Sequence, residues 1–163
     1  MAELTQIETK IAEVIGLAQA AQGATEKVAK LVEDGGLKQT LEQMHREATE
    51  TEERTTKVAE QLDGKKTAIL EKARETKQEA TEMMSTYLGS DADGLDGLEF
   101  MTMAEAGEVG HWQILDTMNQ KARNQELQQV IDWATPIQER HLDEALRGSL
   151  KLAAEEDPNE PAA

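Results

Sequence analysis

Apolar residues recur every three or four positions along most of the chain, and this spacing constrains the fold more than any other feature. Near the start, Ile7, Ile11, Val14 and Ala18 follow one another at these steps. Side chains at such steps share one face of an α-helix, whereas a strand would alternate them between two faces. The pattern predicts five amphipathic helices, over about residues 5–33, 37–62, 65–88, 97–122 and 125–154. The predicted fold class is therefore all-α.

The composition and the loops agree with a helical bundle. Aromatic residues make up only 2% of the 163 residues, whereas good helix formers are abundant. Short loops join long helices, which indicates antiparallel neighbours. The segment over about residues 65–88 is the most polar, so we expect it to be a connector laid over the bundle. We predict one bundle domain over residues 1–154 and a disordered acidic tail over residues 155–163.

Charge and cysteine content exclude several classes of function. The chain carries 33 acidic and 17 basic residues, a net charge of −16, and such a surface repels nucleic acids and anionic membranes. The absence of cysteine excludes disulfides, thiolate zinc sites and iron–sulfur clusters. No apolar run approaches the length of a membrane span, and the N-terminus lacks the apolar core of a signal peptide. We therefore expect a cytoplasmic protein with no nucleic-acid or membrane partner.

Local signals predict where several helices begin or end. Thr5-x-x-Glu8 is typical of a capping box, and Asn124 is expected to cap the last helix. Asp34–Gly36 should end the first helix, and Asp96-x-x-Glu99 should cap the fourth. Pro136 lies inside the last helix, where a kink is expected because proline removes one backbone donor.

The three histidines share one spacing. Each follows a glutamate or glutamine by three residues, in Glu42-x-x-His45, Glu108-x-x-His111 and Gln138-x-x-His141. Three residues are almost one helical turn, so each pair lies on the same face of its helix. Packing these helices together would bring their midpoints close, and imidazole with carboxylate suits iron, manganese or zinc. A hydrogen-bonded His–Glu–Gln network without metal would meet the same need to satisfy buried polar groups.

Three segments resemble a known superfamily. They are Leu-x-x-x-Leu-x-x-x-His at Leu37–His45, Gly-His-Trp-Gln-Ile at Gly110–Ile114, and Gln-Glu-Arg-His-Leu-Asp-Glu-Ala-Leu at Gln138–Leu146. Over Leu37–Leu146 the chain resembles the ferritin-like superfamily, nearest the small bacterial stress-associated proteins of the YciE/YciF type. The resemblance implies an antiparallel four-helix core with an additional crossover helix, a homodimer, and a di-metal centre that acts on oxygen or peroxide.

The resemblance also implies a set of metal ligands, although several positions depart from the family pattern. The residues that could still supply ligands are His45, Glu52, Glu108, His111, Glu139 and His141. Ala48, Gly110, Gln113 and Gln138 stand where the family usually has glutamate. The first hypothesis is thus a ferritin-like, metal-binding stress protein or oxidoreductase, with iron, manganese or zinc at a degenerate di-metal site. The alternative is a metal-free interaction or scaffold bundle that has lost this centre.

Overall fold

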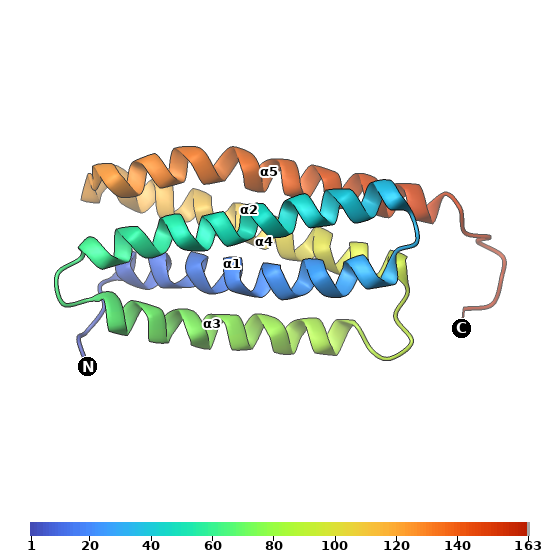
Figure 1. Cartoon of the computed structure of the whole chain (residues 1–163), viewed down its shortest axis with the longest axis horizontal. Helices are drawn as coiled ribbons and strands as arrows, with labels where there is room; N and C mark the ends of the chain where they lie inside the picture. Colours follow the sequence, from blue (N-terminus) through green and yellow to red (C-terminus); the bar gives the residue numbers. More distant parts are fainter. Residues whose placement is uncertain (163) are drawn as a thin grey trace.

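The computed structural model describes residues 1–162 and contains five long helices within that range (Figure 1). They are α1 (Gln6–Leu31), α2 (Gly35–Gln61), α3 (Lys66–Tyr87), α4 (Gly94–Ala122) and α5 (Gln125–Ala153). The all-α fold class is therefore confirmed, and each predicted helix ends within three residues of its observed end. The predicted tail begins after α5, and residues 155–162 are exposed and non-helical; its last residue, 163, lies outside the described residues.

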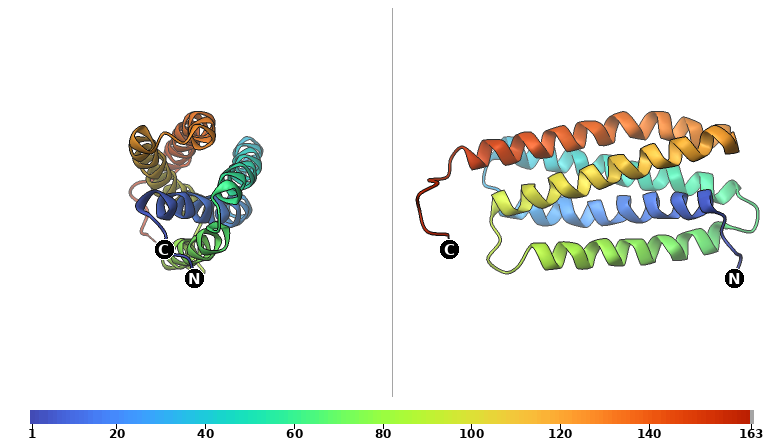
Figure 2. Two further views of the ribbon diagram at one scale, coloured as in Figure 1. Left: turned by 90° about the vertical axis from the view of Figure 1, so that its left-hand side faces the viewer. Right: turned by 180° about the vertical axis from the view of Figure 1, so that it is seen from behind.

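Four helices form a ring around the core, and α3 lies outside this ring. α1 packs against α2 and α4, and α5 packs against α4 and α2, so these four close a ring. α3 packs mainly against α1 and lies along its outer side (Figures 1 and 2). The colours in Figure 1 show that α1, α3 and α5 run in one direction, whereas α2 and α4 run in the other. The connector position expected for the polar third segment is therefore observed.

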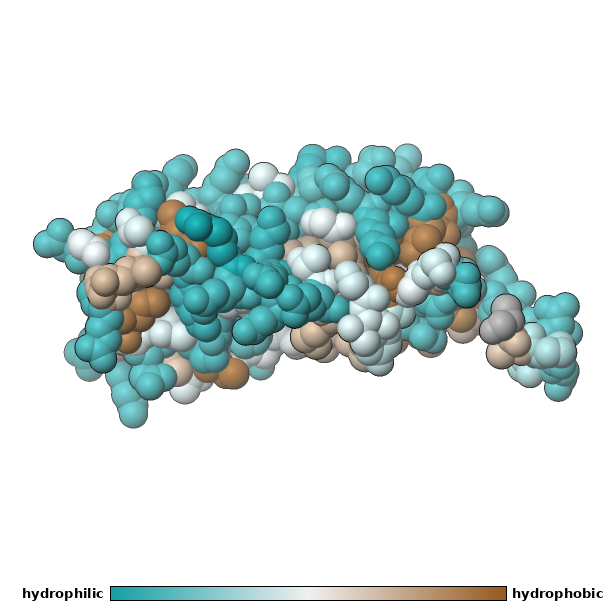
Figure 3. Space-filling model, turned by 90° about the horizontal axis from the view of Figure 1, so that it is seen from below, coloured by the Kyte–Doolittle hydropathy of each residue, from teal (hydrophilic) through white to brown (hydrophobic). Residues whose placement is uncertain are grey.

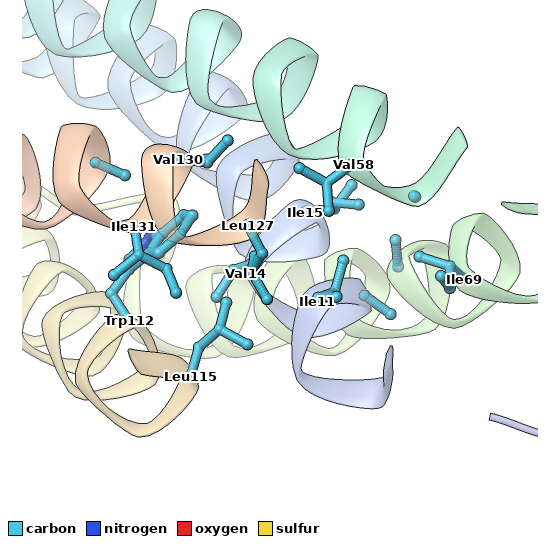
Figure 4. Packing of buried hydrophobic residues seen from close by; sticks show 14 residues of the cluster. Ile11, Val14, Ile15, Val58, Ile69, Trp112, Leu115, Leu127, Val130 and Ile131 are labelled. Carbon is cyan, nitrogen blue, oxygen red and sulfur yellow. The ribbon is translucent and has the colours of Figure 1, made fainter. Parts of the chain in front are cut away.

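The apolar core has two clusters. The first, drawn in Figure 4, gathers Ile11, Ile15, Ile69, Trp112 and Leu115 with their neighbours near the N-terminus of α1. The second gathers the apolar residues at the other end of the bundle, among them Val28, Leu41, Met44, Leu98 and Met101. Because the apolar residues alternate with charged ones along the sequence, no helix within residues 1–162 is long and apolar enough to cross a membrane.

The helix ends confirm some predicted caps and correct others. The Thr5–Glu8 capping box and the Asn124 cap are both present. Asp34 caps the start of α2 instead of ending α1, which stops at Leu31. The predicted Asp96 cap is wrong, because Asp93 already forms a capping box with Asp96 and starts α4 at Gly94. α5 stays helical on both sides of Pro136.

The contact between α1 and α3 depends on one glycine. A Cβ atom built on Gly16 would lie 2.4 Å from the carbonyl oxygen of Ala73, which is closer than real atoms approach. Gly23, two turns further along α1, has open space around the same position. The absence of a side chain at Gly16 therefore allows α3 to lie close to α1.

Candidate functional site

One buried face of α4 changes from apolar to acidic halfway along the helix. Its residues are Leu98, Met101, Glu105, Glu108, Trp112 and Leu115. Glu105 and Glu108 are only 1% and 6% exposed, although carboxylates are almost never fully buried without partners. The spacing of Glu108 and His111 predicts that His111 shares this face. The face is rotated by about one residue, so Trp112 occupies the core and His111 lies at its edge.

Two residues of α5 face this acid pair. Gln138 and His141 stand one turn apart, and both are buried. The Gln138 Nε2 donates to Glu105 Oε2 over 3.3 Å. The His141 Nδ1 lies 3.7 Å from the same carboxylate oxygen, which is beyond hydrogen-bond distance. α4 and α5 therefore place an acid, an amide and an imidazole around one point.

α2 adds a third carboxylate on the other side of the imidazole. Glu47 Oε1 lies 3.3 Å from His141 Nε2, while Glu47 Oε2 accepts from the Arg140 guanidinium. The same guanidinium lies 3.4 Å from Glu144 Oε1. We call Glu47, Glu105, Glu108, Gln138 and His141 the central polar layer. Among the lysines and arginines of residues 1–162, only Arg140 forms an ion pair with a carboxylate of this layer.

Burial determines the protonation state of the layer. Burial raises the pKa of Glu105 to about 7, although hydrogen bonds with Glu108 and Gln138 oppose the rise. The pKa of Glu108 is raised well above its ordinary value by burial and then by the adjacent Glu105. Burial lowers the pKa of His141 in spite of the hydrogen bond with Glu47. Two adjacent buried carboxyl groups cannot both ionise easily, so the pair holds a proton to a higher pH than ordinary carboxyl groups do.

The three histidines have different surroundings. His45 is about one-third exposed, and its Nδ1 lies 3.0 Å from the carbonyl oxygen of Gln22 and 3.2 Å from Thr25 Oγ1. His111 is also one-third exposed; its Nδ1 lies 3.4 Å from Glu13 Oε2, without the alignment of a hydrogen bond. Only His141, which is 2% exposed, belongs to the central polar layer. The shared spacing in the sequence therefore leads to three separate environments.

The glutamates proposed as ligands are separated in the same way. Glu108 lies in the layer, but Glu139 is exposed. Glu52 accepts hydrogen bonds from the side chains of Gln19 and Gln22 on α1. Of the six residues, Glu108 and His141 interact electrostatically in the layer, whereas His45 and Glu52 line a separate hollow. Within residues 1–162, no three histidine, aspartate or glutamate side chains are arranged to hold an ion.

Sequence reasoning missed Glu105 and Glu47. Glu105 stands four residues after Met101 and three before Glu108, so the phase of the apolar residues could have placed it on the buried face. Glu47 stands three residues after Met44 and four before Thr51, which are both buried. The histidine spacing alone does not point to either carboxylate.

Comparisons with protein-family models, with curated proteins and with solved structures find no match for this chain, so the layer is interpreted from its own residues.

Proposed function

We propose that this chain is a ferritin-like bundle that binds one divalent transition-metal ion in its central polar layer. The observation that carries the proposal is the buried set of Glu105, Glu108 and His141, with Glu47 on the far side of the imidazole. These side chains do not yet converge on one point, so binding an ion would require them to rotate toward it. Two carboxylates and an imidazole are ligands that suit iron, manganese or zinc. The helix directions support the ferritin-like part, because a crossover segment between parallel second and third core helices is what that fold requires.

A complete di-metal centre does not fit the residues present. Such centres take a carboxylate from each of two helices and a Glu-x-x-His pair from each of the other two. In α1 the corresponding polar residues are Gln19 and Gln22, and both donate to Glu52. In α5 the residue one turn before His141 is Gln138. The missing carboxylates remove the negative charge that a second ion would need, so we propose a single ion.

A bound ion would supply Lewis-acid or one-electron chemistry. The surrounding side chains would determine its ligands and their protonation. Glu105 and Glu108 would lose their shared proton on binding, because a carboxylate must be ionised to act as a ligand. Glu47 would hold the Nε2 side of His141 and leave Nδ1 facing Glu105. Arg140 would neutralise Glu47 and keep that carboxylate away from the ion. Stress-related metal handling, with or without oxidoreductase activity, is the function that we propose for this arrangement.

Metal content tests the proposal directly. The protein is purified without affinity tag or chelator, its metals are measured by mass spectrometry, and the apoprotein is titrated with iron(II), manganese(II) and zinc(II). We expect one ion per chain, and loss of binding in Glu108→Gln/His141→Gln. The matched control is His45→Ala/His111→Ala, which leaves the layer intact and should bind normally. No binding by the natural chain, or equal binding by both double variants, would overturn the proposal.

A metal-free interaction bundle is the second candidate, and one observation favours it. Gln138 already donates to Glu105 and Arg140 already pairs with Glu47, so the layer can be satisfied by protons and hydrogen bonds alone. Leu146 and Leu150, one turn apart on α5, are 44% and 61% exposed and would serve a homodimer or a partner helix. This candidate predicts a thermal unfolding temperature that chelators do not change. It also predicts loss of self-association in Leu146→Glu/Leu150→Glu by analytical ultracentrifugation.

A further inference from the structure

A cavity of about 250 Å³ opens between α1, α3 and α4. It exists because α3 packs on α1 and touches α4 very little, so these two helices diverge. Its walls are almost wholly apolar and include Leu17, Met84, Phe100 and Ala104. An apolar cavity of roughly 150 Å³ is enough for a benzene-sized molecule, so this one can take a slightly larger guest.

The mouth of the cavity is apolar as well. Met83, Tyr87 and Met103 line it and are 66%, 57% and 46% exposed. In Figure 3, which looks at the side of α3, apolar surface interrupts the hydrophilic face over the half of the molecule where α3 ends. Large apolar side chains at the rim of a hollow favour the entry of an apolar group.

The inner wall is acidic, and the imidazole of His111, whose pKa is lowered by burial, is the basic group that lines the cavity. Glu105 and Glu108 both line the cavity, and both are more than nine-tenths buried. None of the lining residues is lysine or arginine. Gln138 donates to Glu105, and its hydrogen bond with Glu108 lowers the pKa of that acid as well. Among the contacts of residues 1–162, no hydrogen bond from a backbone or basic group reaches Glu108. An apolar channel that ends at such an acidic wall is complementary to a ligand with an apolar body and a head group that is positively charged or donates hydrogen bonds.

From this shape and charge we propose that the cavity binds a small hydrophobic primary amine, with its ammonium group donating to Glu108. A carboxylate of the same length would meet two acidic side chains, and an alcohol would donate a hydrogen bond without the opposite charge that an ammonium group adds. The net charge of −16 would also attract cations and repel anions on approach. The site uses the cavity side of Glu108 and does not depend on the metal proposal.

Three ligands of equal length test this assignment. Hexylamine, hexanol and hexanoate are titrated into the full chain by isothermal calorimetry, with a chelator present so that no metal takes part. We expect hexylamine to bind, hexanol to bind at least roughly tenfold more weakly, and hexanoate not to bind, since a hydrogen bond to a charged group is worth about that factor. Glu108→Gln should reduce hexylamine affinity by about tenfold or more and change hexanol affinity little.

A second pair of variants separates the cavity from the acidic surface. Ala104 lines the cavity, whereas Ala106 on the same helix is exposed and does not. Ala104→Leu should block all binding, and Ala106→Leu should leave it unchanged. The assignment would be overturned by equal affinity for the three ligands, or by hexylamine binding that survives both Glu108→Gln and Ala104→Leu. The assignment would also be overturned if hexylamine does not bind because a second copy of the chain covers the mouth of the cavity. The variant Met83→Glu would reveal such a copy by causing the two chains to dissociate.

Discussion

The buried face of α4 has an apolar part and an acidic part, and the two differ in what their burial costs. Trp112 and Leu115 are 2% and 0% exposed, while Glu105 and Glu108, one to three turns away, are almost as buried. Fully burying a large apolar side chain stabilises a protein by about 1.5–3 kcal/mol, but burying a carboxyl group costs energy unless it is partnered. The ends of the bundle thus account for its stability. Burying the central polar layer lowers the stability of the fold. Proteins accept such losses at functional sites, so this layer is the candidate site.

The largest effect is expected in the apolar part. Leu115→Ala should lower the free energy of unfolding by about 2–5 kcal/mol, because it deletes a fully buried side chain and leaves a cavity. The loss, measured by urea denaturation, should be the same at acidic and neutral pH, since Leu115 belongs to an apolar cluster. The matched control is Ile114→Ala, the adjacent residue, which is 45% exposed and should change stability little. Equal losses for both would contradict the assigned face of α4.

The next effect concerns the packing of α3 on the apolar end. Gly16→Ala should destabilise by about 1–3 kcal/mol, because the added carbon would overlap the Ala73 carbonyl and force α3 away from α1. Gly23→Ala adds the same carbon where nothing is near, and should stabilise by up to about 1 kcal/mol through helix propensity. Thermal unfolding of the two variants measures the difference. If Gly16→Ala is as stable as Gly23→Ala, the close approach of α1 and α3 is wrong.

The acidic part of the α4 face should make the folding stability depend on pH. The pKa of Glu105 is raised to about 7, and that of Glu108 is also raised well above its ordinary value, so above pH about 4.5 the unfolded chain loses protons that the folded chain keeps. Stability contributed by the acid pair is therefore lost as pH rises toward neutrality. The lowered pKa of His141 acts in the opposite direction in acid, as its folded form resists protonation. The Glu108 charge partly offsets this lowering, so the effect of His141 should be somewhat larger in a Glu108 variant.

The comparison with Glu108→Gln isolates that acidic contribution. The variant should be nearly as stable as the natural chain at about pH 5 and more stable by about 1–3 kcal/mol at about pH 8, the usual cost of an unsatisfied buried polar group. Gln138, Glu144 and His141 face the pair in both proteins. Urea denaturation at several pH values provides the measurement. Parallel stability curves would mean that Glu108 ionises without penalty and that the two parts of α4 do not differ.

The sequence predicted the helices better than it predicted the site, and one cause explains both results. Within each helix, apolar residues such as Ile11, Leu41 or Leu127 belong to a series that recurs with the helical period. The existence and length of each helix therefore follow from local spacing. The site depends on the rotation of each helix against its neighbours. A shift of about one residue on α4 replaced His111 by Trp112 at the core and added Glu105. Pairing across helices, such as Glu47 with His141, has no local signal at all.

The smallest effect on stability should come from replacing His45. This histidine shares the sequence spacing of His141 but lies outside the central polar layer. His45 is about one-third exposed and contacts Thr25, the Gln22 carbonyl and Glu26, all on α1 and away from the acid pair. Because its hydrogen bonds can be replaced by water, His45→Ala should lower the free energy of unfolding by less than about 1 kcal/mol. It should also leave metal and hexylamine affinities unchanged, as measured by calorimetry. Loss of either affinity would place His45 in the same site as His141, and α2 would then contribute more to the central polar layer than Glu47.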